Sequence, residues 1–95
     1  MTTSDESEPV RIPITGELDL HAFRPDEIAS LIEEYLAACH RRGMREVRVI
    51  HGKGTGTLRQ TVHALLRRSP LVLSYRSGDE TSGGWGATIA TLRSR

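Results

Sequence analysis

The chain has 95 residues, of which 37% are hydrophobic and 26% are charged, with a formal net charge of +1 and one cysteine. This length suits one domain with a single core, and this composition is typical of a small soluble α/β domain, not of a disordered chain. One cysteine excludes an internal disulfide framework, and no apolar run approaches the roughly 18 residues that suggest a membrane span. The N-terminus is acidic and polar, unlike a signal peptide, so we expect a cytoplasmic protein.

Charge is distributed unevenly along the chain. Residues 1–16 carry three acids and one arginine, a balance of −2, whereas residues 17–95 carry a balance of +3. A mildly basic folded part permits a polyanionic partner but does not by itself identify nucleic acid. Residues 1–9 are rich in Thr, Ser, Asp and Glu and are predicted to be a disordered acidic tail, and residues 10–95 a single domain.

The first half of the chain predicts one strand and one long helix. Residues 10–14 are short and extended, and Pro13 restricts them to an edge or a lead-in segment. Residues 17–21 alternate polar and apolar side chains, the pattern of a half-buried strand. A helix is expected to open at Arg24-Pro25 and to end at Gly43. Its apolar stripe consists of side chains three and four residues apart: Ile28, Leu31, Ile32, Tyr35, Leu36 and Cys39.

The second half predicts a strand, a helix and two more strands. In chain order these are a strand at 46–50, a helix with Thr57 as its N-cap and Ser69-Pro70 at its end, a strand at 71–76 and a strand at 87–92. The order β-α-β-α-β-β implies right-handed crossovers that place both helices on one face of the sheet. We therefore predict an α/β protein of the two-layer α+β sandwich type, with the other sheet face uncovered or covered by a partner.

A glycine-rich loop, His51-Gly52-Lys53-Gly54-Thr55-Gly56, joins the strand at 46–50 to the following helix. Its spacing matches neither the Walker A loop nor the dinucleotide fingerprint. Main-chain N–H groups at a helix start favour an anion, and Lys53 supplies a counter-charge. A tight turn without a ligand is the alternative, although a simple turn rarely needs three glycines.

Two histidines and a carboxylate are expected near this loop. Asp19 and His21 lie on the polar side of the first strand, and His51 follows the second strand. Parallel neighbouring strands would bring both histidines to the same sheet edge, where α/β proteins bind ligands. One histidine could deprotonate an attacking hydroxyl and the other protonate a leaving oxygen, with Asp19 fixing a tautomer. The same three groups could instead hold a divalent metal ion, or be ordinary surface residues.

A second glycine cluster, Gly83-Gly84-Trp85-Gly86, precedes the last strand. Trp85 could stack on a base or pack over the core. Arg48 and Arg76 are predicted on the sheet face away from the helices, where they extend a basic surface or simply face solvent. Cys39 is assigned to the core. His40 and His63 are helix residues to which the sequence assigns no role.

Three of these segments together resemble the small MutS-related (Smr) domain family: Leu18-Asp19-Leu20-His21, His51 to Gly56, and Gly83 to Thr88. The resemblance spans residues 17–92. It implies a four-stranded mixed sheet with two helices on one face, as in the C-terminal domain of translation initiation factor 3. The first two strands would then be parallel neighbours and the last antiparallel, which would bring the three motifs to one edge.

The resemblance also implies nucleic-acid binding and endonuclease activity, either DNA nicking or RNA cleavage. Carried over, the cleavage residues are Asp19, His21 and His51. The phosphate-binding or nucleic-acid-binding residues are Gly52, Lys53, Gly54, Thr55, Gly56, Gly84, Trp85, Gly86, Arg48 and Arg76. One departure is Ala22, where the family usually has a glycine that tolerates more backbone conformations. A binding module without catalysis is the alternative function, and a protein-interaction domain a third.

Overall fold

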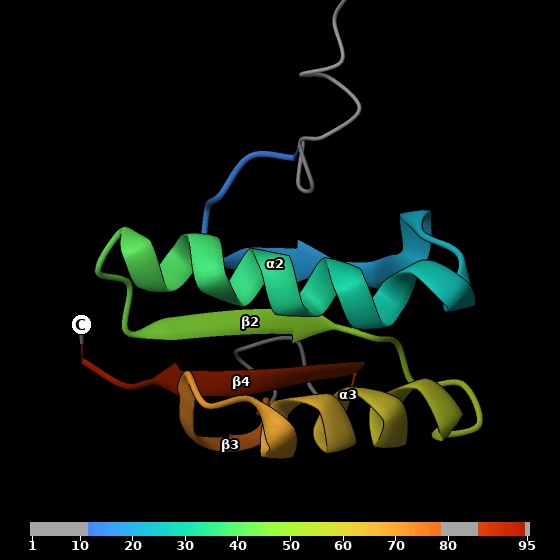
Figure 1. Ribbon diagram of the computed structural model, residues 1–95. Coiled ribbons are helices and arrows are strands. Elements are labelled where there is room, and N and C mark those ends of the chain that lie inside the picture. The colour runs from blue at the N-terminus through green and yellow to red at the C-terminus, as the bar shows by residue number, and fades with distance from the viewer. Residues whose placement is uncertain (1–11, 79–85, 95) are drawn as a thin grey trace, which may run out of the picture.

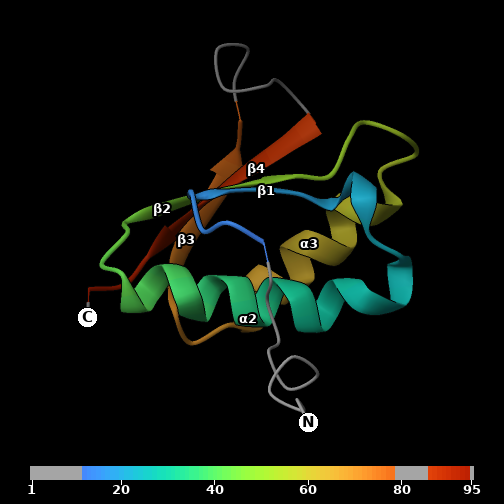
Figure 2. The same ribbon diagram turned by 90° about the horizontal axis from the view of Figure 1, so that it is seen from above.

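The computed structural model describes residues 12–78 and 86–94, which form one mixed sheet with both α-helices on the same side (Figures 1 and 2). The elements in chain order are β1 (Glu17–Asp19), the 3-10 helices η1 (Leu20–Ala22) and η2 (Pro25–Glu27), α2 (Ile28–Arg41), β2 (Glu46–Ile50), α3 (Thr57–Arg68), β3 (Val72–Ser77) and β4 (Ala87–Leu92). Both long helices lie where the sequence pattern predicts them. In the described part of the chain, no helix is long and apolar enough to cross a lipid bilayer.

The sheet has the strand order β1-β2-β4-β3. β1 pairs in parallel with β2, whereas β4 is antiparallel to both of its neighbours, β2 and β3. The predicted four-stranded mixed sheet with two helices on one face is therefore confirmed. Because β1 and β2 run in the same direction, the residues that follow them, in η1 and in the glycine loop, emerge at one edge.

The core lies between the sheet and the two helices. Leu18, Val47 and Val49 from the sheet and Val62 and Leu66 from α3 are at most 1% exposed. Tyr35 and Cys39 of α2 are fully buried as well, so the assignment of Cys39 to the core is confirmed.

Tyr35 also fixes the start of β1. Its hydroxyl accepts a hydrogen bond from Gly16 N at 3.1 Å and donates to the Glu17 carbonyl at 3.1 Å. A buried polar group costs free energy unless it is hydrogen-bonded, and both main-chain partners of the Tyr35 hydroxyl belong to the segment that leads to the first motif.

Three predicted boundaries are wrong. The first strand does not reach His21, because Asp19 Oδ1 accepts a hydrogen bond from His21 N at 2.9 Å and turns the chain into η1. The N-cap of α3 is Gly56, with φ +91°, and Thr57 is the first helical residue. The strand predicted at 71–76 lies one residue later, at Val72–Ser77.

Candidate functional site

The first part of the site is a carboxylate–imidazole pair in the turn after β1. Asp19 Oδ1 lies 2.7 Å from His21 Nδ1 and also accepts from His21 N. These hydrogen bonds, that from the His21 main chain above all, lower the pKa of Asp19 below 3.8 against the opposing effect of desolvation. An ionised carboxylate only accepts, so His21 Nδ1 carries a proton, and in the neutral ring the lone pair is on Nε2.

His21 Nε2 faces the backbone of the glycine loop. A methyl group added at Gly52 would come within 2.9 Å of His21 Nε2, and Gly52 has φ +81°. Gly86 approaches Gly52 from the third motif, since a methyl group at Gly86 would lie 3.4 Å from the Gly52 Cα. The Gly86 carbonyl accepts from both His51 N at 2.8 Å and Gly52 N at 2.9 Å. The structure therefore brings His21, the glycine loop and Gly86 to one place.

The loop opens into a cleft of about 510 Å³ at the start of α3. The lining residues are His21, Pro25, Ile28, His51, Gly52, Lys53, Gly54, Thr55, Gly56, Thr57, Leu58, Arg59 and Thr61. Gly56, the N-cap of α3, has no side chain to accept from the first N–H groups of the helix, although the Thr57 N–H donates a long hydrogen bond, of 3.4 Å, to Thr55 Oγ1. An exposed helix start with a glycine N-cap, beside two cationic side chains, Lys53 and Arg59, is a favourable place for an anion.

His51 lies differently from the expected catalytic histidine. Its side chain is buried, with 4% of the residue exposed. Nδ1 lies 2.9 Å from the Gly52 carbonyl oxygen, and Nε2 lies 2.9 Å from Thr88 Oγ1. Both ring nitrogens are thus hydrogen-bonded within the fold. The buried His51 contacts the loop from the protein interior, whereas the exposed His21 contacts it from the solvent side.

His63, to which the sequence assigned no role, belongs to the same cluster. Its Nε2 lies 2.9 Å from Thr88 Oγ1, the oxygen that also contacts His51. Thr88 itself is fully buried on β4. The helical period placed His63 on α3. It could not show which strand this face of the helix covers, so the sequence did not predict the contact between His63 and Thr88.

The remaining predicted residues fall into two groups. Arg48 pairs with Glu17, and Arg76 Nη2 lies 3.4 Å from Glu46 Oε2, so both arginines of the open sheet face have carboxylate partners. Gly83, Gly84 and Trp85 lie outside the described residues.

Two expectations remain: that Asp19, His21 and His51 could hold a metal ion, and that Ala22 departs from the glycine usual in the family. Across residues 12–78 and 86–94, no group of three or more His, Cys, Asp and Glu side chains could hold a metal ion, so Asp19, His21 and His51 do not form a ligand set. Ala22 ends η1, and no non-glycine residue of the described ranges has a positive φ, so alanine is compatible with the backbone there.

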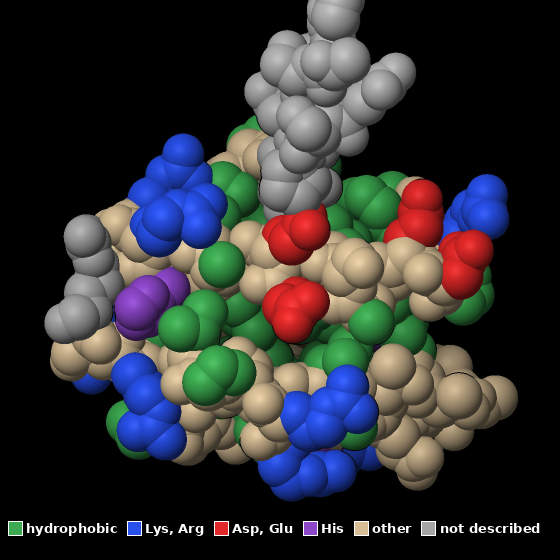
Figure 3. Space-filling model, viewed as in Figure 1, with side chains coloured by type: hydrophobic (Ala, Val, Ile, Leu, Met, Phe, Trp, Pro, Cys, Tyr) green, Lys and Arg blue, Asp and Glu red, His purple; other side chains and the backbone are tan. Residues whose placement is uncertain are grey.

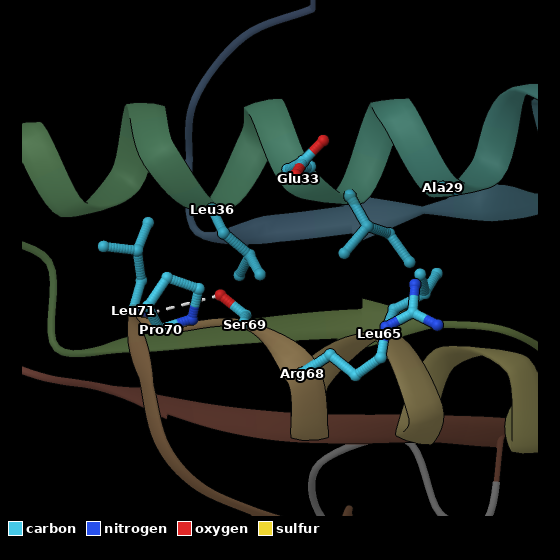
Figure 4. Close-up of a pocket in the computed structure, with 9 residues that line it drawn as sticks. Ala29, Glu33, Leu36, Leu65, Arg68, Ser69, Pro70 and Leu71 are labelled. Atoms are coloured by element: carbon cyan, nitrogen blue, oxygen red, sulfur yellow. Dashed lines mark hydrogen bonds between the residues drawn. The ribbon is translucent and has the colours of Figure 1, made fainter.

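A second hollow, of about 260 Å³, lies between α2 and α3 (Figure 4). Leu36, Leu65 and Leu71 point into it, and Glu33 and Arg68 stand on its two walls. It shares no lining residue with the cleft at the glycine loop. Its apolar lining offers no acid–base pair, so we place the functional site at the loop.

Comparison with known proteins decides the family. The family described as "Smr domain" matches residues 18–93. The chain belongs to the Smr domain family. Endonuclease MutS2 of Halothermothrix orenii is 41% identical over 81 residues, which cover 85% of this chain and 10% of that protein. Endonuclease MutS2 of Thermomicrobium roseum is 43% identical over 79 residues, or 83% of this chain and 10% of that protein. The chain therefore spans about a tenth of the length of these curated relatives.

Two solved Smr structures have the same fold. The Smr domain of Thermus thermophilus MutS2 superposes with a TM-score of 0.76 at 35% identity, covering 81% of this chain and 96% of that one. YdaL, a stand-alone small MutS-related protein from Escherichia coli, superposes with a TM-score of 0.78 at 25% identity, covering 96% of this chain and 74% of that one. The resemblance inferred from the three motifs is thereby confirmed at the level of family and fold.

Proposed function

We propose that this Smr domain binds nucleic acid at the glycine loop and cleaves a phosphodiester bond there. The observation that carries the proposal is the Asp19–His21 pair, whose outward nitrogen, Nε2, faces the loop at Gly52. Relatives named endonuclease MutS2 contain a domain of this family, which supports the same class of reaction.

The division of labour follows from the geometry. Asp19 holds the proton on His21 Nδ1, so the neutral ring presents a lone pair at Nε2 and acts as the general base on the attacking hydroxyl or water. As the new bond to phosphorus forms, the bond from phosphorus to the leaving oxygen breaks, and that oxygen takes a proton from the solvent that reaches the exposed site. The negative charge of the phosphate faces the start of α3 together with Lys53 and Arg59. His51 is assigned a supporting part, because its ring nitrogens are engaged with Gly52 and Thr88.

A non-catalytic binding module is the second candidate function, and the burial of His51 favours it. Of the three expected catalytic groups, His51 has no ring nitrogen left for proton transfer. A loop that holds a phosphate without cutting would need only the cationic side chains and the N–H groups at the start of α3. The two functions share the same binding surface and differ in whether His21 matters.

The deciding experiment incubates fluorescently labelled RNA and DNA oligonucleotides, with and without chelator, with wild-type protein and the His21→Ala and Asp19→Asn variants. We expect His21→Ala to lower the cleavage rate by about 10²–10⁴-fold, the range for loss of a general base, and to leave the binding constant within about twofold. Asp19→Asn should slow cleavage less severely, because it disturbs the tautomer of His21 without removing the ring.

His40→Ala is the matched control, since His40 is a partly exposed histidine on α2 and does not line the cleft. Cleavage that continues unchanged in His21→Ala would refute the catalytic proposal. Salt-sensitive binding without cleavage in the wild type would establish the binding module instead.

A further inference from the structure

A chain of three hydrogen bonds runs from α3 through β4 into the glycine loop. His63 Nε2 lies 2.9 Å from Thr88 Oγ1, Thr88 Oγ1 lies 2.9 Å from His51 Nε2, and His51 Nδ1 lies 2.9 Å from the Gly52 carbonyl oxygen. The chain joins residues that are 25 and 37 positions apart in the sequence. It connects α3 to the loop peptide through the interior, beside a direct edge-on contact of the His51 and His63 rings, whose centroids are 6.3 Å apart.

Elementary chemistry fixes the direction of every bond in this chain. A carbonyl oxygen only accepts, so His51 Nδ1 must be the donor to Gly52. The neutral His51 ring then has its lone pair on Nε2, and the Thr88 hydroxyl donates to it. Thr88 Oγ1 is left as an acceptor, and His63 Nε2–H donates to it. All three side chains therefore have defined protonation sites.

The ring of His63 is itself held in place. It lies against Tyr75 of β3, with ring centroids 4.8 Å apart and an interplanar angle of 47°. The Tyr75 hydroxyl accepts a hydrogen bond from Arg67 Nη1 at 3.0 Å, which ties the same strand back to α3. The far end of the chain is consequently anchored by packing as well as by hydrogen bonding.

The near end of the chain sets the orientation of a peptide unit. In a trans peptide the carbonyl and the following N–H point in opposite directions. With the Gly52 carbonyl held toward the buried His51 ring, the N–H of Lys53 points away from that ring. Rotation of this peptide would change which main-chain groups the loop presents to a phosphate beneath His21 Nε2.

We propose that His63 is a positioning residue, which acts through Thr88 and His51 to fix the Gly52–Lys53 peptide in the orientation that the bound phosphate requires. The catalytic consequence rests on the nuclease function proposed above. The effect on the loop does not, because the order of the loop can be measured without substrate.

Paired variants test the chain. Thr88→Val removes the hydroxyl at nearly constant volume, and Thr88→Ser keeps it. His63→Leu removes the donor, and His63→Gln places an amide N–H at a similar reach. His40→Gln serves as the control for a histidine outside the chain.

The first measurement is hydrogen exchange and chemical shift of the loop amides, with ¹⁵N spectra of the histidine rings. We expect His51 to be protonated at Nδ1 and unprotonated at Nε2 in the wild type. Exchange of the Gly52 amide, which donates to the Gly86 carbonyl, should rise about tenfold in Thr88→Val and His63→Leu, and the Lys53 amide shift should change, while Val47 and Val49 of β2 stay protected. Thr88→Ser and His63→Gln should restore the wild-type values.

The second measurement is cleavage of a labelled oligonucleotide. The disrupting variants should lose about tenfold in kcat with little change in KM, the cost of a small misplacement of reacting groups, and the conservative variants should recover most of it. Unchanged loop exchange in both Thr88→Val and His63→Leu, or a His51 ring protonated at Nε2 instead of Nδ1, would overturn the proposal. Should the loop respond as expected in a protein that cuts no nucleic acid, the positioning role stands and the nuclease function falls.

Discussion

Gly52 is important both for the backbone conformation of the loop and for the position of His21. Its φ of +81° is a left-handed conformation that L side chains rarely adopt, and a methyl group there would come within 2.9 Å of His21 Nε2. A substitution would therefore strain the backbone and displace the proposed general base at the same time.

We expect Gly52→Ala to lower the free energy of unfolding by about 1–2 kcal/mol and to reduce cleavage further than that loss of stability explains. Gly43→Ala is a matched control, because Gly43 also has a positive φ, +78°, but a methyl group there would meet nothing within 4 Å. Urea denaturation compares the backbone cost, and cleavage at a temperature where both variants are folded compares the site. Equal activity in the two variants would show that the contact with His21 is unimportant.

His63 gives the stability of the protein a dependence on pH. Desolvation, with the positive charges of Arg59 and Arg67 on the same helix and the nearby His51 ring, lowers the pKa of His63 below 6.5. The unfolded chain then binds more protons than the folded chain in the range below about 6.5, so stability is full above that pH and is lost as the pH falls toward the folded pKa.

The measurement is the thermal midpoint of the wild type and of His63→Gln between about pH 5 and pH 7. We expect the midpoint of the wild type to fall more steeply with acidification than that of the variant. Identical slopes would mean that His63 does not contribute to the acid sensitivity.

At the level of single residues, the sequence predicted the contacts and turns that involve residues close together in the chain. Asp19 and His21 are two positions apart, so their contact was within reach of the sequence, and the loop was visible from its three glycines. The role of His63 was not, because its partner Thr88 is 25 residues away and becomes a neighbour only through the packing of α3 on the sheet. For the same reason, nothing in the sequence showed that both nitrogens of His51 are engaged in the interior.

At the level of elements, periodicity located α2 and α3, whose buried residues are spaced three and four apart. The alternation of polar and apolar residues predicted a first strand that is too long, because Leu20 is buried in the 3-10 turn just as it would be in a strand. What ends β1 is a side-chain hydrogen bond from the chain to Asp19, which competes with continued pairing. Similarly, Thr57 has the chemistry of an N-cap, but Gly56 takes that position because the loop arrives with a positive φ.

On the scale of the whole molecule, one part of the chain is purely basic. Residues 47–78 contain six Lys and Arg residues and no Asp or Glu. Figure 3 shows Asp and Glu side chains over the middle of α2, and Lys and Arg side chains both beside the ends of that helix and over the lower part of the helical face, where α3 lies. The two arginines of the open sheet face are paired with carboxylates. The described residues that line the cleft at the glycine loop include Lys53 and Arg59 but no Asp or Glu, so the cleft is a basic surface suited to a polyanion.

The position of the cleft predicts unequal contributions to nucleic-acid binding. Lys53→Gln, which changes a residue that lines the cleft, should reduce the slope of log K against log salt concentration by about 0.7–0.9, the value for one lost phosphate contact. Arg76→Gln should leave that slope unchanged, because Arg76 lies on the sheet face away from the helices and does not line the cleft. Fluorescence anisotropy of a labelled oligonucleotide at several salt concentrations measures both. Equal losses in the two variants would place part of the bound strand on the sheet face.

The strand order β1-β2-β4-β3 has a consequence for how the protein folds during its synthesis. The ribosome releases β1, β2 and β3 before it releases the strand that separates β2 from β3. Until residues 86–92 emerge, the Gly52 N–H lacks the Gly86 carbonyl, His51 lacks Thr88, and β2 and β3 lack the strand that lies between them. Such long-range pairing is slow to form. A nascent chain therefore cannot assemble the glycine loop early, and the proposed nuclease would stay inert beside the messenger RNA until β4 has been synthesised.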